Sequence, residues 1–152
     1  MCGIAGYVSQ EIKEGRAVLE RMNQEMIHRG PDGAGFYTNG RVGLCMRRLS
    51  IIDLLGGNQP IWNEDQTVGI VFNGEIYNFR ELRGELLQKG HRFSTKCDTE
   101  VIVHLYEEKG IHCLEDLNGM FAFAIYDRNQ DLLFLARDRM GEKPLHYYFK
   151  EG

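Results

Sequence analysis

The order of strand-like and helix-like segments is the feature that most constrains the fold of this chain. Long apolar segments typical of β-strands occupy 67–78 and 119–138, and a polar turn at 128–131 divides the second. Another strand is expected within 41–54, before a glycine- and proline-containing break at 56–60. Strands therefore cluster towards both ends of the chain, with two helices between them. This order predicts an α+β protein with antiparallel sheets rather than a series of βαβ units.

The helices are expected from apolar periodicity and from end signals. The first covers 15–27, where Leu19, Met22 and Met26 share one face, and a turn-rich stretch follows at 28–35.

The other two helices have recognisable ends. Asn78 and Glu81 have the spacing of a capping box, and Gly90 would stop that helix. Asp98 is expected to cap the next helix, which would end at Gly110.

The composition is typical of one soluble globular domain. The chain has 152 residues, of which 43% are hydrophobic, and its net charge is -4. We expect neither a membrane nor a nucleic acid as a partner, because no apolar run approaches about 20 residues and the overall charge is acidic. The cysteines form no CxxC pair, which favours a reduced, cytoplasmic protein over a disulfide or zinc framework. They are Cys2, Cys45, Cys97 and Cys113.

Several kinds of chemistry have no motif in this sequence. There is no GxxxxGK[ST] loop, no GxGxxG after a strand, no HExxH and no GxSxG. The five histidines share no ligand spacing, so we expect each to be a surface residue or a satisfied core residue, and we predict no metal site. The neighbouring Glu107 and Glu108 are expected to lie on a solvated helix face.

Cys2 has the chemistry of a terminal nucleophile. Removal of Met1 would leave a thiol and a free α-amino group on one residue. An α-amino group titrates near 7.7–8.0, so it can accept the thiol proton and later return it to a leaving group. Such a cysteine needs no histidine as general base. Position alone does not distinguish this role from the common presence of small residues after an initiator methionine.

Six motifs in one order resemble the glutaminase domain of glutamine-hydrolysing asparagine synthetases, a branch of the class II amidotransferases. The resemblance extends from Cys2 to about Tyr148 and rests on "CGIAG", "HRGPDG", "RLSIIDL", "NGEIYN", "DTEVI" and "GMFAFAIYD". It implies the N-terminal-nucleophile hydrolase fold, a four-layer α-β-β-α sandwich with two antiparallel sheets. It also implies hydrolysis of the glutamine side-chain amide to glutamate and ammonia.

The resemblance assigns the reacting groups. Cys2 would attack the amide of L-glutamine, and the Asn73 side chain and the Gly74 backbone N–H would stabilise the oxyanion. The alternative for Asn73-Gly74 is a hairpin turn, since this pair is a strong hairpin signal. The residues that follow lead into a helix, which favours the oxyanion role.

The resemblance also assigns the groups that recognise glutamine. Arg48 would hold the α-carboxylate, for which a bidentate guanidinium is suited. The backbone groups of Ile51 and Ile52 would line the pocket, and Glu75 and Asp98 would receive the α-ammonium.

Two positions depart from the family pattern. Met46 stands where a histidine is often found, and Cys97 stands where a serine is common. Neither change affects the nucleophile or the oxyanion donors, so they bear on glutamine affinity and rate more than on the reaction. Cys97 could also be a second oxidisable site.

We interpret residues 1–152 as one class II glutamine amidotransferase domain from a longer protein. The missing part would be a synthetase domain that uses ATP and Mg, whereas this domain would need no cofactor. Aspartate is the expected ammonia acceptor, and a homodimer remains open. The alternatives are another asparagine-synthetase-like amidotransferase, an N-terminal-nucleophile hydrolase for a different amide, and a non-catalytic regulatory module of the same fold.

Overall fold

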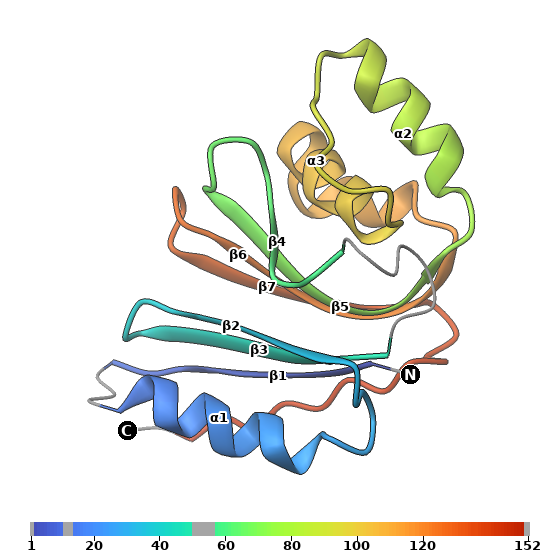
Figure 1. The fold of residues 1–152 in the computed structure, drawn as a ribbon. Helices are drawn as coiled ribbons and strands as arrows, with labels where there is room; N and C mark the ends of the chain where they lie inside the picture. Colours follow the sequence, from blue (N-terminus) through green and yellow to red (C-terminus); the bar gives the residue numbers. More distant parts are fainter. Residues whose placement is uncertain (1, 11–13, 50–56, 151–152) are drawn as a thin grey trace.

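Four layers form the molecule, in the order helix, sheet, sheet, helices (Figure 1). The computed structural model describes residues 2–10, 14–49 and 57–150. The first layer is α1, Gly15–Glu25, and the outer layer on the opposite side contains α2, Phe79–Gln88, and α3, Thr99–Lys109. The predicted α-β-β-α sandwich with two antiparallel sheets is confirmed.

The first sheet has the strand order β1-β3-β2 and is antiparallel throughout. Its strands are β1, Gly3–Val8, β2, Gly33–Thr38, and β3, Val42–Arg48. Because β3 is central and ends at Arg48, it brings the start of β1 and the start of β2 to the same end of the sheet. This end holds Cys2.

The second sheet has the order β4-β5-β6-β7 and is also antiparallel. Its strands are β4, Ile61–Trp62, β5, Val68–Ile76, β6, Gly119–Asp127, and β7, Leu132–Arg137. The long β5 and β6 pair along their whole lengths, from Val68 opposite Asp127 to Ile76 opposite Gly119. β5 therefore lies in the interior of the molecule and can position a site along its length.

Two apolar cores hold the layers together. The larger one packs α2 and α3 on the second sheet, and α3 is buried from Thr99 to Tyr106. The smaller core lies between the two sheets and contains Val42, Leu44, Met46, Val71, Ala124 and Tyr126. The sheets are thus fixed face to face by side chains of β3, β5 and β6.

The strand predictions were correct for β5, β6 and β7 and incomplete elsewhere. β2 begins inside the stretch that was predicted as turns. Gly35 is needed for another reason, because a Cβ at this position would lie 1.5 Å from the carbonyl oxygen of Gln59. Glycine here serves close strand packing rather than a turn. Of the strand predicted within 41–54, the described part ends at Arg48, and 50–54 lies outside the described residues. The short β4 and a 3₁₀ helix at Gly110–Glu115 were not predicted.

The helix bounds agree with the predicted end signals, but the capping interactions are different. The Asn78 side chain donates to the Asp116 carbonyl and accepts from the Asn118 N–H, so the predicted capping box does not form. Asp98 precedes α3 without a side-chain cap bond and instead accepts from the N–H of Ile76 at 2.8 Å. Both side chains bind neighbouring segments in place of their own helices. Within the described ranges, no helix has the length and apolarity needed to cross a membrane.

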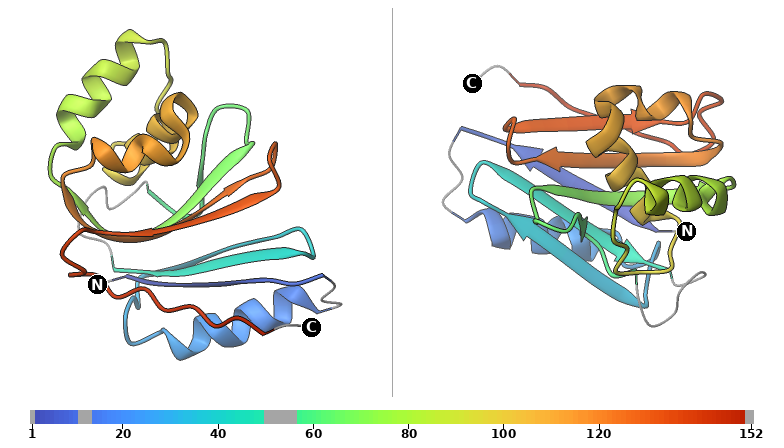
Figure 2. Two further views of the ribbon diagram at one scale, coloured as in Figure 1. Left: turned by 180° about the vertical axis from the view of Figure 1, so that it is seen from behind. Right: turned by 90° about the horizontal axis from the view of Figure 1, so that it is seen from above.

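After β7 the chain leaves the second sheet and passes the first sheet to the level of α1 (Figure 2). Asp138, just beyond β7, accepts hydrogen bonds from the backbone N–H groups of Phe121, Glu142 and Lys143. This carboxylate fixes the turn at 138–143 against β6.

Candidate active site

Six of the eight predicted site residues line one cavity of about 100 Å³. They are Cys2, Arg48, Asn73, Gly74, Glu75 and Asp98. Four separate parts of the chain supply them: the start of β1, the end of β3, the C-terminal half of β5 and the start of α3. The other two predicted residues, Ile51 and Ile52, lie outside the described residues.

Cys2 is half-buried at the start of β1, and its thiol lies against the backbone that follows β3. The N–H of Leu49 donates to the Cys2 sulfur at 3.4 Å, and the Leu49 carbonyl oxygen lies 3.7 Å from the same sulfur. An N–H donor can stabilise a thiolate, and a carbonyl can accept from a thiol. Arg29 donates to the Cys2 carbonyl at 3.5 Å. The thiol is therefore held at the cavity by backbone groups.

Asn73 and Gly74 lie within β5, so the hairpin alternative is wrong. The Asn73 side chain is almost fully buried and lines the cavity, yet no described residue donates to it or accepts from it. A buried amide without a protein partner is unusual. Its N–H groups are consequently available to a molecule in the cavity.

Gly74 has a structural requirement that the sequence did not indicate. A Cβ at this position would lie 2.1 Å from the Met120 carbonyl oxygen and 2.7 Å from the Cα of Phe121. Glycine is therefore required for the close approach of β5 and β6, in addition to any approach of a ligand.

Arg48 ends β3 with a buried side chain. Its guanidinium donates to the Asn58 side chain at 3.2 Å, and its carbonyl accepts from the N–H of Asp32. The "HRGPDG" segment packs against the same backbone, since a Cβ at Gly30 would lie 2.5 Å from the carbonyl carbon of Arg47. This segment holds the end of β3 in place beside the cavity.

Glu75 and Asp98 form a carboxylate pair at the cavity wall. Burial, together with the negative charge of Glu75, raises the pKa of Asp98 above its usual value, although the N–H of Ile76 opposes this effect. No described residue forms an ion pair or hydrogen bond with the Glu75 carboxylate. A cation placed between the two groups would relieve their repulsion. The pair is suited to an ammonium group.

Lys143 is a buried residue of the cavity wall that the sequence analysis missed. The hydrogen bond from its backbone N–H to Asp138 holds it there. The sequence signals available were the turn residues Gly141 and Pro144, which show a turn after β7 but do not show where it packs.

The two departures from the family pattern differ in position. Met46 is buried in the core between the sheets and is not among the cavity-lining residues. Cys97 does line the cavity, where burial raises the pKa of its thiol and disfavours the reactive thiolate. The structure therefore places only Cys97 where it could contact a substrate.

Comparison with known proteins first defines the class. Glutamine phosphoribosylpyrophosphate amidotransferase from B. subtilis superimposes with a TM-score of 0.65 at 22% identity, over 84% of this chain and 35% of that one. The fold is that of the N-terminal-nucleophile amidotransferases. A family model described as "Glutamine amidotransferase domain" matches residues 1–152, and the chain belongs to this family.

Asparagine synthetases are among the similar curated proteins. Asparagine synthetase [glutamine-hydrolyzing] 2 of Bacillus subtilis is 46% identical over 151 residues, which cover 97% of this chain and 20% of the relative. Asparagine synthetase B of Escherichia coli is 41% identical over 153 residues, covering 99% of this chain and 27% of the relative. The chain thus spans about a fifth to a quarter of the length of these relatives.

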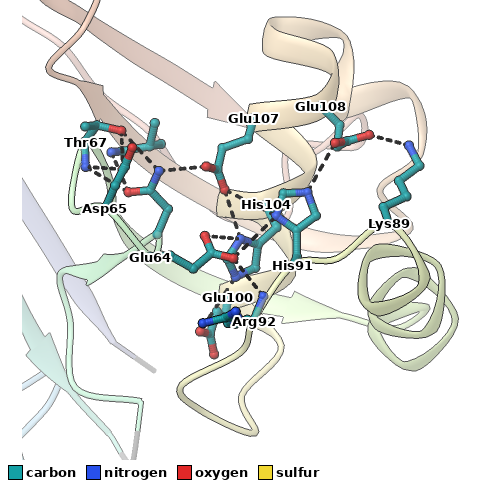
Figure 3. Close-up of polar contacts among 12 residues, drawn as sticks. Glu64, Asp65, Thr67, Lys89, His91, Arg92, Glu100, His104, Glu107 and Glu108 are labelled. Atoms are coloured by element: carbon teal, nitrogen blue, oxygen red, sulfur yellow. Dashed lines mark hydrogen bonds and ion pairs between the residues drawn. The ribbon is translucent and has the colours of Figure 1, made fainter.

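A second group of polar residues tests the expectations for the histidines and for Glu107 and Glu108. The two glutamates are exposed on α3, as predicted. The expectation for the histidines fails at buried His104, whose Nε2 has no hydrogen bond within the described residues. His91 and His104 have their ring centroids 4.8 Å apart, and both glutamates bind a histidine (Figure 3). The sequence analysis missed this arrangement because the two histidines come from different segments, a loop and a helix, with no characteristic spacing.

Proposed function

We propose that this domain hydrolyses the side-chain amide of L-glutamine with Cys2 as the nucleophile, after removal of Met1. The observation that carries the proposal is the Asn73 amide, which has no partner among the described residues and lies in the same cavity as the Cys2 thiol. Membership of the glutamine amidotransferase family supports it.

The reaction would proceed in two steps. The Cys2 thiol transfers its proton to the free α-amino group, and the sulfur attacks the amide carbon of glutamine. Asn73 and the Gly74 N–H stabilise the negative oxygen, the C–N bond breaks, and ammonia leaves with the returned proton. Water then attacks the γ-glutamyl thioester, which releases glutamate and restores the thiol.

The remaining cavity residues would select a free amino acid. Arg48 would bind the α-carboxylate, while Glu75 and Asp98 would receive the α-ammonium. The position of the two carboxylates supports this assignment. Both line the cavity, burial and the charge of Glu75 raise the pKa of Asp98, and no described residue forms an ion pair with either carboxylate. A hydrolase for a different amide would have no need of such a pair. Ile51 and Ile52 remain predicted pocket residues.

We further propose that the ammonia is used by a synthetase domain in the same, cytoplasmic protein. The names of the similar asparagine synthetases and their greater length support this, with aspartate as the acceptor. ATP and Mg would act in that domain, and glutamine hydrolysis here would need no cofactor.

The test is intact mass spectrometry before and after incubation with 6-diazo-5-oxo-norleucine, an electrophilic glutamine analogue. We expect loss of one methionine and one adduct per chain at Cys2, with glutamine as a competitor of labelling. Cys97 is the internal control, because a buried thiol with a raised pKa should stay unlabelled. A processed chain that neither reacts nor hydrolyses glutamine would favour the non-catalytic module.

A further inference from the structure

Four side chains converge on one point beside the outer helix layer, and none of them lines the Cys2 cavity. Glu64 comes from the turn between β4 and β5, His91 from the loop between α2 and α3, and His104 and Glu107 from α3 (Figure 3). One nitrogen or oxygen atom from each lies within 4.8 Å of all the others. We call these four residues the histidine–carboxylate cluster.

Four of the distances within the cluster are near those between ligands of one ion, and every distance is at most 4.8 Å. His104 Nδ1 lies 2.9 Å from Glu107 Oε2 and 3.5 Å from Glu64 Oε2. His91 Nδ1 lies 3.7 Å from both Glu107 Oε2 and Glu64 Oε1. Four ligands held at about 2.1 Å from a tetrahedral zinc ion would be about 3.4 Å apart. The cluster therefore needs only small movements to enclose such an ion.

The outer nitrogen of each histidine faces a second carboxylate. His91 Nε2 lies 3.2 Å from Glu108 Oε1, and Glu108 is bound by Lys89. His104 Nε2 lies 3.8 Å from Glu100 Oε1 and has no hydrogen bond within the described part of the chain. A metal-binding histidine commonly directs its other nitrogen at a carboxylate in this way, which fixes the tautomer and ring orientation.

The glutamates of the cluster are also held from outside. Asn63 donates to Glu107 Oε1 at 2.7 Å, which leaves Oε2 directed at the histidines. The N–H of Arg92 donates to Glu64 Oε1 at 2.7 Å. The ligand atoms are thus positioned by contacts independent of one another, as required of a preorganised site.

Each of the two histidines makes a hydrogen bond through only one ring nitrogen among the described residues. If His91 Nε2 carries the proton that faces Glu108, its Nδ1 lone pair points at two carboxylates that are too distant for hydrogen bonds. His104, whose side chain is fully buried, bonds through Nδ1 to Glu107 Oε2 at 2.9 Å, and its Nε2 has no hydrogen bond within the described residues. A cation between the four groups would bind the His91 Nδ1 lone pair together with the carboxylates that face it.

We propose that the histidine–carboxylate cluster binds a divalent metal ion of the zinc class through His91 Nδ1, His104 Nδ1, Glu64 and Glu107. Two imidazoles and two carboxylates are a ligand set for Zn²⁺ rather than for Ca²⁺ or Mg²⁺, which take mainly oxygen ligands. With all four positions filled by protein, the ion would be structural. It would tie the β4–β5 turn and the loop before α3 to α3 itself.

The direct test is titration of the chelator-treated full chain with Zn²⁺ in a Cys2→Ser background, which removes the reactive thiol as a competing ligand. Isothermal titration calorimetry should give one ion per chain. In the His91→Ala and Glu64→Gln variants the affinity should fall about 100-fold or more, because each removes a direct ligand. Both positions are partly exposed, so these variants should fold where a substitution of buried His104 could fail.

His112→Ala is the matched control. This histidine pairs with Glu115 through the same kind of contact, at 2.9 Å, but is exposed and outside the cluster. The variant should bind Zn²⁺ like the parent. Co²⁺ should give the visible absorption of a four-coordinate site in the parent and in His112→Ala, and should lose it in His91→Ala.

Three results would overturn the proposal. They are no binding of Zn²⁺, binding of equal strength in His91→Ala and Glu64→Gln, and a six-coordinate Co²⁺ spectrum in the parent. In the first case the two imidazoles are balanced by protons, which proton NMR of the ring hydrogens would show.

Discussion

The Cys2 cavity and the histidine–carboxylate cluster are both made of polar side chains from distant segments, but they use those side chains differently. In the cavity, Asn73 and Glu75 have no protein partners within the described chain. In the cluster, Glu64 and Glu107 are both held by hydrogen bonds from outside. Groups without protein partners are suited to reversible binding of a substrate, whereas groups oriented by other hydrogen bonds are suited to holding an ion. α3 connects the two regions, since it starts at the cavity and carries half of the cluster.

The largest expected effect separates the two regions. Cys2→Ala should lower the rate of glutamine hydrolysis about 10⁴-fold or more, because no other group can form the thioester. Zn²⁺ affinity should be unchanged, since Cys2 contacts Leu49 and Arg29 and not the cluster. An ammonia-release assay and a Zn²⁺ titration of the same sample measure both. Loss of Zn²⁺ binding in this variant would mean that the thiol, not the cluster, holds the ion.

Asn73→Ala tests whether the unpartnered amide acts on the reaction. We expect kcat to fall about 100- to 1,000-fold, as on removal of an oxyanion donor, with little change in the free energy of unfolding. Asn78→Ala is the matched control, because that amide binds Asp116 and Asn118. It should cost about 1–2 kcal/mol of stability and leave kcat unchanged. Steady-state kinetics and urea unfolding measure kcat and the free energy of unfolding of both variants. If both variants change these two quantities equally, the Asn73 amide has no specific role in the reaction.

Asp98→Asn examines the charge of the carboxylate pair without removing its hydrogen bond. The amide oxygen can still accept from the N–H of Ile76, but the neutral group attracts an ammonium less. We expect KM for glutamine to rise about 10- to 100-fold with a smaller change in kcat, as for a charge-assisted contact of about 1.5–3 kcal/mol.

The raised pKa of Asp98 also predicts the direction in which Asp98→Asn changes the free energy of unfolding. The folded-state pKa of Asp98 is raised, so the carboxylate opposes folding once the pH exceeds its unfolded value near 3.8. Replacing it with the amide should therefore leave the free energy of unfolding at pH 7 unchanged or increased. A strongly destabilised variant would show that Asp98 is mainly structural.

Much of the cavity could be predicted from the sequence, and the cluster could not, for a physical reason. Cys2, Arg48 and Asn73 lie in short motifs whose residues are adjacent in the chain. The cluster brings together Glu64 and His91, 27 positions apart, through the packing of a turn and a loop on α3. Local spacing carries no information about such packing.

The fold shows the same limit. The strands β5, β6 and β7 have strong apolar patterns and were predicted, as were the helices on the second sheet. β2 and β4 depend on contacts with distant backbone, for example Gly35 against Gln59. The side-chain caps predicted for Asn78 and Asp98 were wrong because tertiary partners outcompete local ones. Ordinary propensity rules describe only the local alternative.

Asp138 is a carboxylate that accepts several backbone hydrogen bonds, whereas Glu75 has no partner within the described part of the chain. Burial raises the pKa of Asp138, but hydrogen bonds from Lys143, Glu142 and Phe121 outweigh this and lower it below its usual value. The stabilisation is therefore present above the unfolded pKa near 3.8 and lost as the pH falls below it. Asp138→Asn should cost about 2 kcal/mol at pH 7 and much less near pH 3. Urea unfolding at the two pH values measures this, and a cost independent of pH would contradict it.

The smallest effect is expected at Met46, the departure from the family pattern that lies outside the cavity. Because the side chain is 1% exposed in the core between the sheets, Met46→Leu should change stability by less than about 1.5 kcal/mol and leave kcat/KM for glutamine unchanged. Met46→His, which restores the common family residue, should cost stability, since the site is lined by apolar groups such as Val71 and Ala124. Thermal unfolding and glutaminase kinetics distinguish the two effects. A gain in kcat/KM on Met46→His would show that this core position of β3 affects the reaction in the cavity. The distinction between residues that pack the core and residues that face the substrate would then not hold for Met46.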